Sequence, residues 1–334
     1  MKYINHRNKK VIVALITGFV LFLSACSGNA SIAESDQNSE TIRIGYQKNG
    51  TTLLLRQNEQ LEQALNEKGY TVEWSEFNTA SSVLEALNAN SVDFANAGDA
   101  PSVMALSKGM DFQFIVTEPS SPHREAILIP EDSTIQSIKD LKGKKVAYNQ
   151  ASIAQYLLAK ALETEGLTLD DVESVYLAPS DASIAFANGE VDAWVTWDPY
   201  MTVAQESGNI ILTTGEGIVP LRSFFVASPD IIEKEPEVVN TFVNHVKEVG
   251  RSIDEDPTEA ANVLEEATKI ESSVWKTTLS SKTNVLETVD QEAIDDLQTL
   301  TTDLKEIGMI TETVDIENHV WQPELREGVD NYEK

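Results

Sequence analysis

Four aspartates lie in two similar stretches of the chain, and paired carboxylates are what general acid and base catalysis would use. The first stretch, residues 86–101, carries Asp93 and Asp99, and the second, residues 186–200, carries Asp192 and Asp198. In both, Val-Asp opens a short apolar run and the second Asp follows six residues later at a turn. Aspartate at such a turn more often caps the next helix than acts on a substrate, so we favour capping.

Other signatures of catalysis and metal binding are sparse. The chain has no G-x-G-x-x-G, P-loop, G-x-S-x-G or H-E-x-x-H motif. Its four histidines, His6, His123, His245 and His319, are scattered, and its single cysteine is Cys26. Such residues supply a His/Cys metal site or a cysteine nucleophile poorly, so we expect no enzyme, no metal and no cofactor.

Several predicted helices begin directly after a predicted strand or loop with small polar residues. These starts are at residues 50–52, 79–82, 98–100 and 149–152. A helix N-terminus presents free backbone N–H groups and a partial positive charge. Several of them around one cleft would bind an anion without requiring lysine.

Aromatic residues accompany the second aspartate stretch. Trp194 falls within the predicted strand and is expected in the core, whereas Trp197 and Tyr200 fall in the following loop. At least one of the three should line the cleft and give the anion site an apolar wall.

Arg222 is the second residue of a predicted strand at residues 221–227 that returns to the first part of the chain. Its side chain could swing into the cleft, where a guanidinium can give two parallel hydrogen bonds to an anion. The alternative is that Arg222 pairs with carboxylates at the surface.

Strand-like and helix-like segments alternate along most of the chain, which predicts an α/β fold. Residues 41–46 predict a strand, and residues 50–69 predict one amphipathic helix closed by Gly69. Residues 137–140 form a capping box that predicts a short helix. From Asp230 onward the pattern is mainly helical and acidic, and we expect this tail to pack on the outside.

The two similar stretches suggest two lobes, each offering one strand end to a shared cleft. We place the first lobe at residues 41–129 and 222–334, including the helical tail, and the second at residues 130–221.

The N-terminus predicts export. Residues 1–26 combine four basic residues, an uncharged run at residues 11–25 and the sequence LSAC ending at Cys26, which looks like a bacterial lipobox. Cys26 would then be lipidated and would anchor the chain at the extracytoplasmic face of the cell membrane. Residues 27–40 are small and polar and predict a flexible tether.

The chain carries 54 acidic and 25 basic residues, a net charge of −29. Phosphate recognition needs a basic surface, so we expect no nucleic-acid partner.

Seven short motifs carry a resemblance to the substrate-binding lipoproteins of aliphatic sulfonate ABC transporters. They are IGYQK at 44–48, LEALN at 84–88, VDF at 92–94, AGDAP at 97–101, DLKGKKVA at 140–147, VDAW at 191–194 and WDPY at 197–200. The likeness implies a two-lobed, type II periplasmic-binding-protein fold. It also implies a monomer that hands a small organic anion, an alkanesulfonate, to ABC permease subunits.

By position, the resemblance implies a ligand-binding set made of Gln47, Thr79, Gly98, Asp99, Ser152, Trp197, Asp198 and Arg222. The chain departs from the family pattern at residues 78–81 and 150–153, where Ala151 replaces a glycine. A glycine there could adopt a positive φ or leave room for the anion, so its replacement affects how the backbone approaches the anion. Both departures fall in the expected lining of the pocket, so the ligand's tail could differ from the family norm.

Two other groups of functions stay open. A binding protein for taurine, nitrate or a thiamine-precursor pyrimidine is the first group. A taurine site should have a carboxylate, Asp198 or Glu118, free in the cleft, whereas nitrate has no tail to fill an aromatic pocket. A secreted enzyme of the same fold would need a general base beside the ligand.

Overall fold

The computed structural model describes residues 40–48 and 50–323. These residues belong to one compact unit. The expected signal, Cys26 and nearly all of the expected tether lie outside the described residues.

The first of two sheets has five strands in the order β2-β1-β3-β10-β4. β1 pairs in parallel with β2 and β3, and β10 runs antiparallel to β3 and β4. The strands are β1 (Glu40–Tyr46), β2 (Tyr70–Glu76), β3 (Phe94–Gly98), β4 (Gln113–Thr117) and β10 (Ser223–Ala227).

The second sheet repeats this arrangement in the order β7-β6-β8-β5-β9. β6 is parallel to β7 and β8, and β5 runs antiparallel to β8 and β9. The strands are β5 (Glu125–Ile129), β6 (Lys145–Tyr148), β7 (Glu173–Tyr176), β8 (Ala193–Trp197) and β9 (Ile210–Thr214). β5 therefore holds the place in this sheet that β10 holds in the first.

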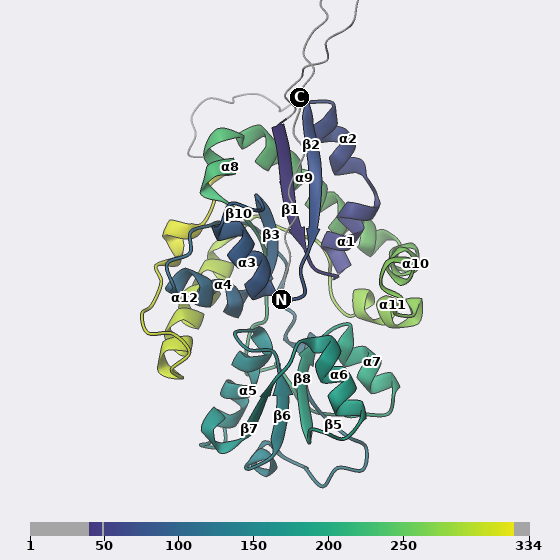
Figure 1. Ribbon diagram of the computed structural model, residues 1–334, viewed down its shortest axis with the longest axis vertical. Coiled ribbons are helices and arrows are strands. Elements are labelled where there is room, and N and C mark those ends of the chain that lie inside the picture. Colours follow the sequence, from purple (N-terminus) through teal and green to yellow (C-terminus); the bar gives the residue numbers. More distant parts are fainter. Residues whose placement is uncertain (1–39, 49, 324–334) are drawn as a thin grey trace, which may run out of the picture. The chain divides into compact units, whose positions relative to one another are not determined.

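Helices cover both sheets, with α5, α6 and α7 grouped around the second (Figure 1). The helices before β10 are α1 (Gly50–Gln57), α2 (Gln60–Asn66), α3 (Ala80–Asn88), α4 (Asp99–Ser107), α5 (Ile153–Glu163), α6 (Pro179–Ala187) and α7 (Tyr200–Glu206). Those after β10 are α8 (Pro229–Lys234), α9 (Pro236–Glu255), α10 (Pro257–Thr268), α11 (Ser272–Ser280) and α12 (Gln291–Glu306). No described helix has both the length and the apolar character of a membrane span.

The two similar stretches fold alike, as α3-β3-α4 and α6-β8-α7. Asp93 precedes β3, and its Oδ2 accepts the N–H of Arg43 in β1 at 2.7 Å. Asp192 precedes β8, and its Oδ2 accepts the N–H of Lys145 in β6 at 2.8 Å. Both aspartates thus fix a parallel strand pair, so the first Asp of each stretch has a structural task.

Three elements differ from expectation. β5, which we grouped with the first lobe at residues 41–129, pairs in the second sheet, because the chain crosses over at the proline-rich break of residues 119–122. The expected single helix at 50–69 is two helices, since Glu59 between them has a φ of 55°. β9 was not predicted; it lies at the edge of the second sheet, next to β5. The limits of the two lobes otherwise stay a prediction.

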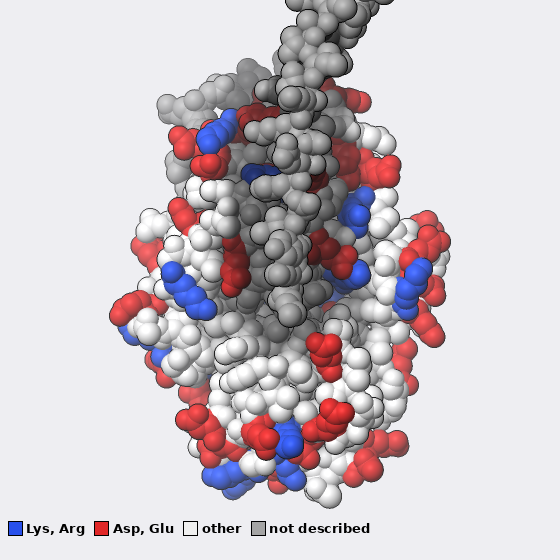
Figure 2. Space-filling model, viewed as in Figure 1, with Lys and Arg blue, Asp and Glu red and all other residues white. Residues whose placement is uncertain are grey.

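Large apolar side chains fill the space between sheets and helices. Trp194 is 2% exposed, as expected for a core residue, and Phe94 stacks on Phe242 of α9 with centroids 4.1 Å apart. Phe242 belongs to the apolar face of the amphipathic helix α9, and this face packs against the first sheet. Acidic side chains spread over the visible surface around both sheets (Figure 2). Such a surface favours solubility.

Candidate functional site

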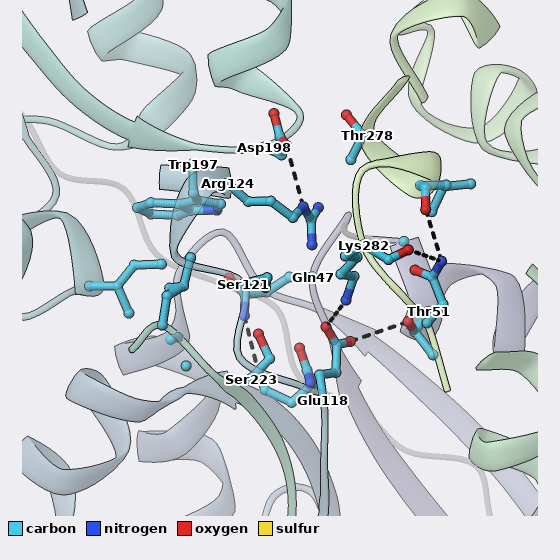
Figure 3. Close-up of a pocket in the computed structure, with 18 of the residues that line it drawn as sticks. Gln47, Thr51, Glu118, Ser121, Arg124, Trp197, Asp198, Ser223, Thr278 and Lys282 are labelled. Carbon is cyan, nitrogen blue, oxygen red and sulfur yellow. Dashed lines mark hydrogen bonds and ion pairs between the residues drawn. The ribbon is translucent and has the colours of Figure 1, made fainter. Parts of the chain in front are cut away.

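A pocket lies where elements of both sheets meet the C-terminal helical region. Gln47 and Gly98 line it from the first sheet's side, and Arg124 and Trp197 line it from the second (Figure 3). A further part of the wall comes from residues 275–284, within and after α11. Its volume is about 110 Å³, which suits a small molecule rather than a polymer.

Five of the eight expected ligand-binding residues line this pocket: Gln47, Gly98, Ser152, Trp197 and Asp198. Gln47 donates from Nε2 to the carbonyl of Asn96 at 3.2 Å. Gly98 ends β3, where a Cβ would lie 2.9 Å from Cγ2 of Ile153. A glycine at this position therefore lets the start of α5 approach the end of β3 closely.

Ser152 caps α5 at the pocket wall. Its Oγ accepts the N–H of Gln155 at 3.4 Å and donates to the carbonyl of Asn149 at 2.6 Å. Beside it, Ala151 has a φ of 52°, the left-handed conformation that glycine adopts more readily. The N–H of Ala151 donates to Oε1 of Gln155 at 2.7 Å, so this amide is occupied within the helix cap.

Thr79 and Asp99 do not line the pocket. Thr79 is the N-cap of α3 and accepts the N–H of Ser82 at 3.2 Å. Asp99 is 3% exposed; its Oδ1 accepts from the N–H of Ala100 at 2.7 Å and its Oδ2 from that of Arg222 at 2.9 Å. Burial raises the pKa of Asp99 to about 6. Thr79 thus holds the start of α3 in place, and Asp99 holds the start of α4 beside Arg222.

The expectation that Arg222 enters the cleft is wrong. Its Nε donates to Asp296 at 2.6 Å and its Nη2 donates to Glu292 at 2.6 Å, both on α12. The side chain of Arg222 is 7% exposed and does not line the pocket, although its neighbours Leu221 and Ser223 do. Two carboxylates attract a guanidinium more strongly than a solvated cleft does, and Arg222 consequently fastens α12 to the first sheet.

A cation that does reach the pocket is Arg124, which was not among the residues expected from the sequence. Its Nε donates to Oδ2 of Asp198 at 3.3 Å. Oδ1 of Asp198 accepts from the N–H and Oγ1 of Thr202, at 3.2 and 2.7 Å, at the start of α7. Neither Nη1 nor Nη2 of Arg124 has an acceptor among residues 40–48 and 50–323, and the guanidinium ends in the pocket (Figure 3).

Arg124 and Arg222 occupy equivalent places in the two sheets. Each comes directly before its crossing strand, β5 or β10. The N–H of Asp198 donates to the carbonyl of Arg124 at 3.0 Å, and the N–H of Asp99 donates to that of Arg222 at 2.9 Å. A comparison of the two aspartate stretches that also included the crossing strands β5 and β10 would have placed Arg124 beside Asp198.

A buried ion pair forms another part of the wall. Glu118 follows β4, and its Oε2 accepts from Nζ of Lys282, while its Oε1 accepts from Oγ1 of Thr51 at 3.2 Å. The side chains of Glu118 and Lys282 are 13% and 6% exposed. The helical tail was expected on the outside, but the segment after α11 reaches this pocket; no motif of the sequence indicated it.

The charged residues that line the described pocket are two cations, Arg124 and Lys282, and two carboxylates, Glu118 and Asp198. Each carboxylate is already paired, whereas Arg124 keeps two nitrogens for a ligand. Among the described residues no three His, Cys, Asp or Glu side chains come together in a way that could hold a metal ion. The arrangement can bind one small anion.

Comparison with known proteins gives this pocket a context. The family model described as NMT1/THI5 like matches residues 65–260, more than half of the chain. The chain belongs to the NMT1/THI5-like family. The family membership agrees with the pattern of motifs described above.

Individual relatives are more specific. A protein of Escherichia coli (strain K12), provisionally named as aliphatic sulfonates-binding, is 33% identical over 88% of this chain and 92% of its own length. Among solved structures, the alkanesulfonate-binding protein SsuA from Xanthomonas axonopodis pv. citri bound to MOPS has a TM-score of 0.78 and 28% identity, covering 84% of this chain and 98% of that one.

The periplasmic aliphatic sulphonate binding protein SsuA from Escherichia coli has a TM-score of 0.76 and 30% identity, covering 88% of this chain and 96% of that one. The predicted α/β periplasmic-binding-protein fold is confirmed by these two structures.

Proposed function

We propose that the protein is an extracytoplasmic solute-binding protein that captures an aliphatic sulfonate in this pocket and delivers it to an ABC importer. The observation that carries the proposal is the guanidinium of Arg124, which ends in the pocket with two nitrogens that have no acceptor among the described residues. The relatives described above, whose names concern sulfonates, support the same ligand class.

The chemistry of a sulfonate fits this site. A sulfonate is always ionised and offers three oxygens, two of which can accept parallel hydrogen bonds from Nη1 and Nη2 of Arg124. Gly50 and Thr51 at the start of α1 also line the pocket, and the positive end of the helix dipole favours an anion there. We therefore assign the anionic group to the region between Arg124 and α1.

The tail of the ligand meets an apolar wall. Trp197, Trp275 and Leu279 line the pocket together, and aromatic and aliphatic side chains gain free energy when they bury a hydrocarbon chain. Nitrate has no such tail, so this wall favours an organic anion.

The pairing of the two pocket carboxylates argues against the taurine-binding and enzyme alternatives. Taurine would need Asp198 or Glu118 free, but Asp198 is bound to Arg124 and Glu118 to Lys282. The same pairing leaves neither carboxylate as a general base, so we propose binding and no catalysis.

The finer parts of the assignment rest on the sequence. We propose that Cys26 anchors the protein by lipid at the extracytoplasmic face of the membrane, that its partner is the transmembrane part of an ABC permease, and that the binding protein is a monomer. Gln47, Gly98, Ser152, Trp197 and Asp198 remain the proposed contacts, joined by Arg124.

Substitution of Arg124 tests the proposal. Calorimetry with short alkanesulfonates should show Arg124→Ala binding at least thirtyfold more weakly, since a charge-assisted contact in a desolvated site is worth about 2 kcal/mol or more. Arg124→Lys should lose part of that affinity, because an ammonium cannot bind two oxygens side by side.

Arg222→Ala is the matched control. It removes the equivalent arginine of the first sheet, so the affinity should stay within threefold of wild type while Tm falls, because Glu292 and Asp296 lose their partner. Wild-type affinity in Arg124→Ala would contradict the assignment. If sulfonates leave the wild-type Tm unchanged but taurine, nitrate or a pyrimidine raises it, the ligand class is wrong.

A further inference from the structure

Glu118, one of the two carboxylates of the pocket, is paired with Lys282 from a distant part of the same chain. Glu118 and Lys282 are far apart in sequence, yet they form an ion pair whose side chains are 13% and 6% exposed. Both residues line the same pocket as Arg124, and Figure 3 shows Nζ of Lys282 directed at Glu118. A surface lysine would be mobile and solvated, but this one is part of the wall.

The fold fixes the position of Lys282. Asn284, two residues later, donates from Nδ2 to Oδ1 of Asp254 at 2.7 Å and to the carbonyl of Leu279 at 2.9 Å. Farther along, Thr117 and Glu287 exchange two backbone hydrogen bonds of 2.9 and 3.1 Å. The segment is thus tied to α9 and to β4, and these contacts hold the ammonium group of Lys282 beside Glu118.

Lys282 also decides the charge of Glu118. Burial by itself raises the pKa of Glu118, but the charge of Lys282 and its hydrogen bond, with help from Arg124 and Thr51, outweigh burial and leave the pKa below its ordinary value. Glu118 is therefore a carboxylate at neutral pH. Loss of Lys282 would remove the largest contribution that lowers this pKa, and Glu118 would then need another cation to stay fully charged.

We propose that Lys282 is a specificity-determining residue that occupies the place at which a ligand's ammonium group would neutralise Glu118. The inference deepens the proposed function and rests on it. The pocket then selects sulfonates with an uncharged tail and rejects aminosulfonates. An aminosulfonate would bring a second ammonium next to Lys282 and would give up its hydration without gaining a free carboxylate.

A different role for Lys282 makes a different prediction. If its ammonium held the sulfonate directly, its loss would weaken charged-tail and uncharged-tail ligands by the same factor. If it neutralises Glu118, its loss changes the ratio between them. The ratio of two affinities, and not either affinity alone, is therefore the decisive quantity.

The experiment is calorimetry with two matched ligand pairs, ethanesulfonate with taurine and propanesulfonate with 3-aminopropanesulfonate. The wild type should prefer the uncharged member of a pair at least tenfold. Lys282→Ala should move this ratio at least tenfold toward the amine, because Glu118 becomes available to it. The double variant Glu118→Gln/Lys282→Ala should return the ratio to within threefold of wild type.

Lys276→Ala controls for the loss of a positive charge, since Lys276 lies on α11 with an exposed side chain. Lys282→Gln, which keeps a donor beside Glu118, carries the same prediction if Lys282→Ala is too unstable for calorimetry. A ratio unchanged in both Lys282 variants, or a ratio that stays shifted in the double variant, would overturn the proposal.

A second measurement separates this proposal from the proposed function. Methylammonium should raise the Tm of Lys282→Ala, because it can pair with Glu118, but not the Tm of wild type or of the double variant. Failure of every sulfonate to bind the wild type would refute the proposed function, and absence of this rescue would refute the role of Lys282.

Discussion

Glu125 is a buried acid at the point where the chain enters the second sheet. It is the first residue of β5 and is 0% exposed, and neither carboxylate oxygen has a hydrogen-bond partner among the described residues. Burial, with the nearby charge of Asp99, raises the pKa of Glu125 well above its ordinary value of 4.5. The folded protein therefore binds a proton here more readily than the unfolded chain does.

This difference gives a pH dependence of stability. Between the ordinary and the raised pKa the folded state holds more protons than the unfolded state, so its free energy of unfolding falls as pH rises above about 4.5. Glu125→Gln keeps the shape but cannot ionise, and its Tm should fall less than that of wild type between pH 5 and 8. One pKa unit is about 1.4 kcal/mol, so we expect a difference of about 2 °C or more.

Asp99, whose pKa burial raises to about 6, will leave part of the decline in place. Glu131→Gln is the control, since Glu131 is exposed. Parallel pH profiles of Glu125→Gln and wild type would mean that Glu125 ionises normally in the folded protein.

At the scale of elements, α9 positions the wall of the pocket through one glycine. A Cβ on Gly250 would lie 2.2 Å from the carbonyl oxygen of Asn284 and 2.6 Å from Cδ1 of Leu286. Backbone cannot yield as a flexible side chain does, so Gly250→Ala must displace the segment that carries Lys282. We expect a loss of about 1–3 kcal/mol in stability and weaker sulfonate binding.

Denaturant unfolding and calorimetry would measure both effects of Gly250→Ala. Glu248→Ala, at an exposed position of the same helix, should change neither. Full affinity in Gly250→Ala would show that the segment after α11 can move without disturbing the pocket.

The sequence predicted elements better than it predicted which side chains face the ligand. Periodicity and the repeated Val-Asp pattern located α3, β3, α6 and β8, because hydrophobic spacing is a local property. Arg124 and Arg222 have the same local setting, one residue before a crossing strand, and only the carboxylates of α12 draw Arg222 away. Lys282 lies in a segment with no periodic pattern, so its contact with Glu118 could come only from the tertiary structure.

At the scale of the whole molecule, the proposed function requires the binding protein to stay near its permease. If Cys26 is lipidated, the wild type should sediment with membranes and Cys26→Ser should be released, because even one lipid chain with a second signal retains a protein at the bilayer. Fractionation followed by immunoblotting measures this. A wild type recovered wholly in the soluble fraction would exclude the lipid anchor.

The order of strands also bears on how the chain folds. The second sheet is continuous in sequence from β5 to β9, whereas the first requires β10, which is made last and inserts between β3 and β4. Contacts between residues distant in sequence form late, since closing a long loop has a high entropic cost. The second sheet can therefore be complete while β3 and β4 still expose unpaired edges, and an edge of that kind is open to pairing with another chain. If β10 pairs slowly with β3 and β4, the first sheet would be more prone to aggregate than the second.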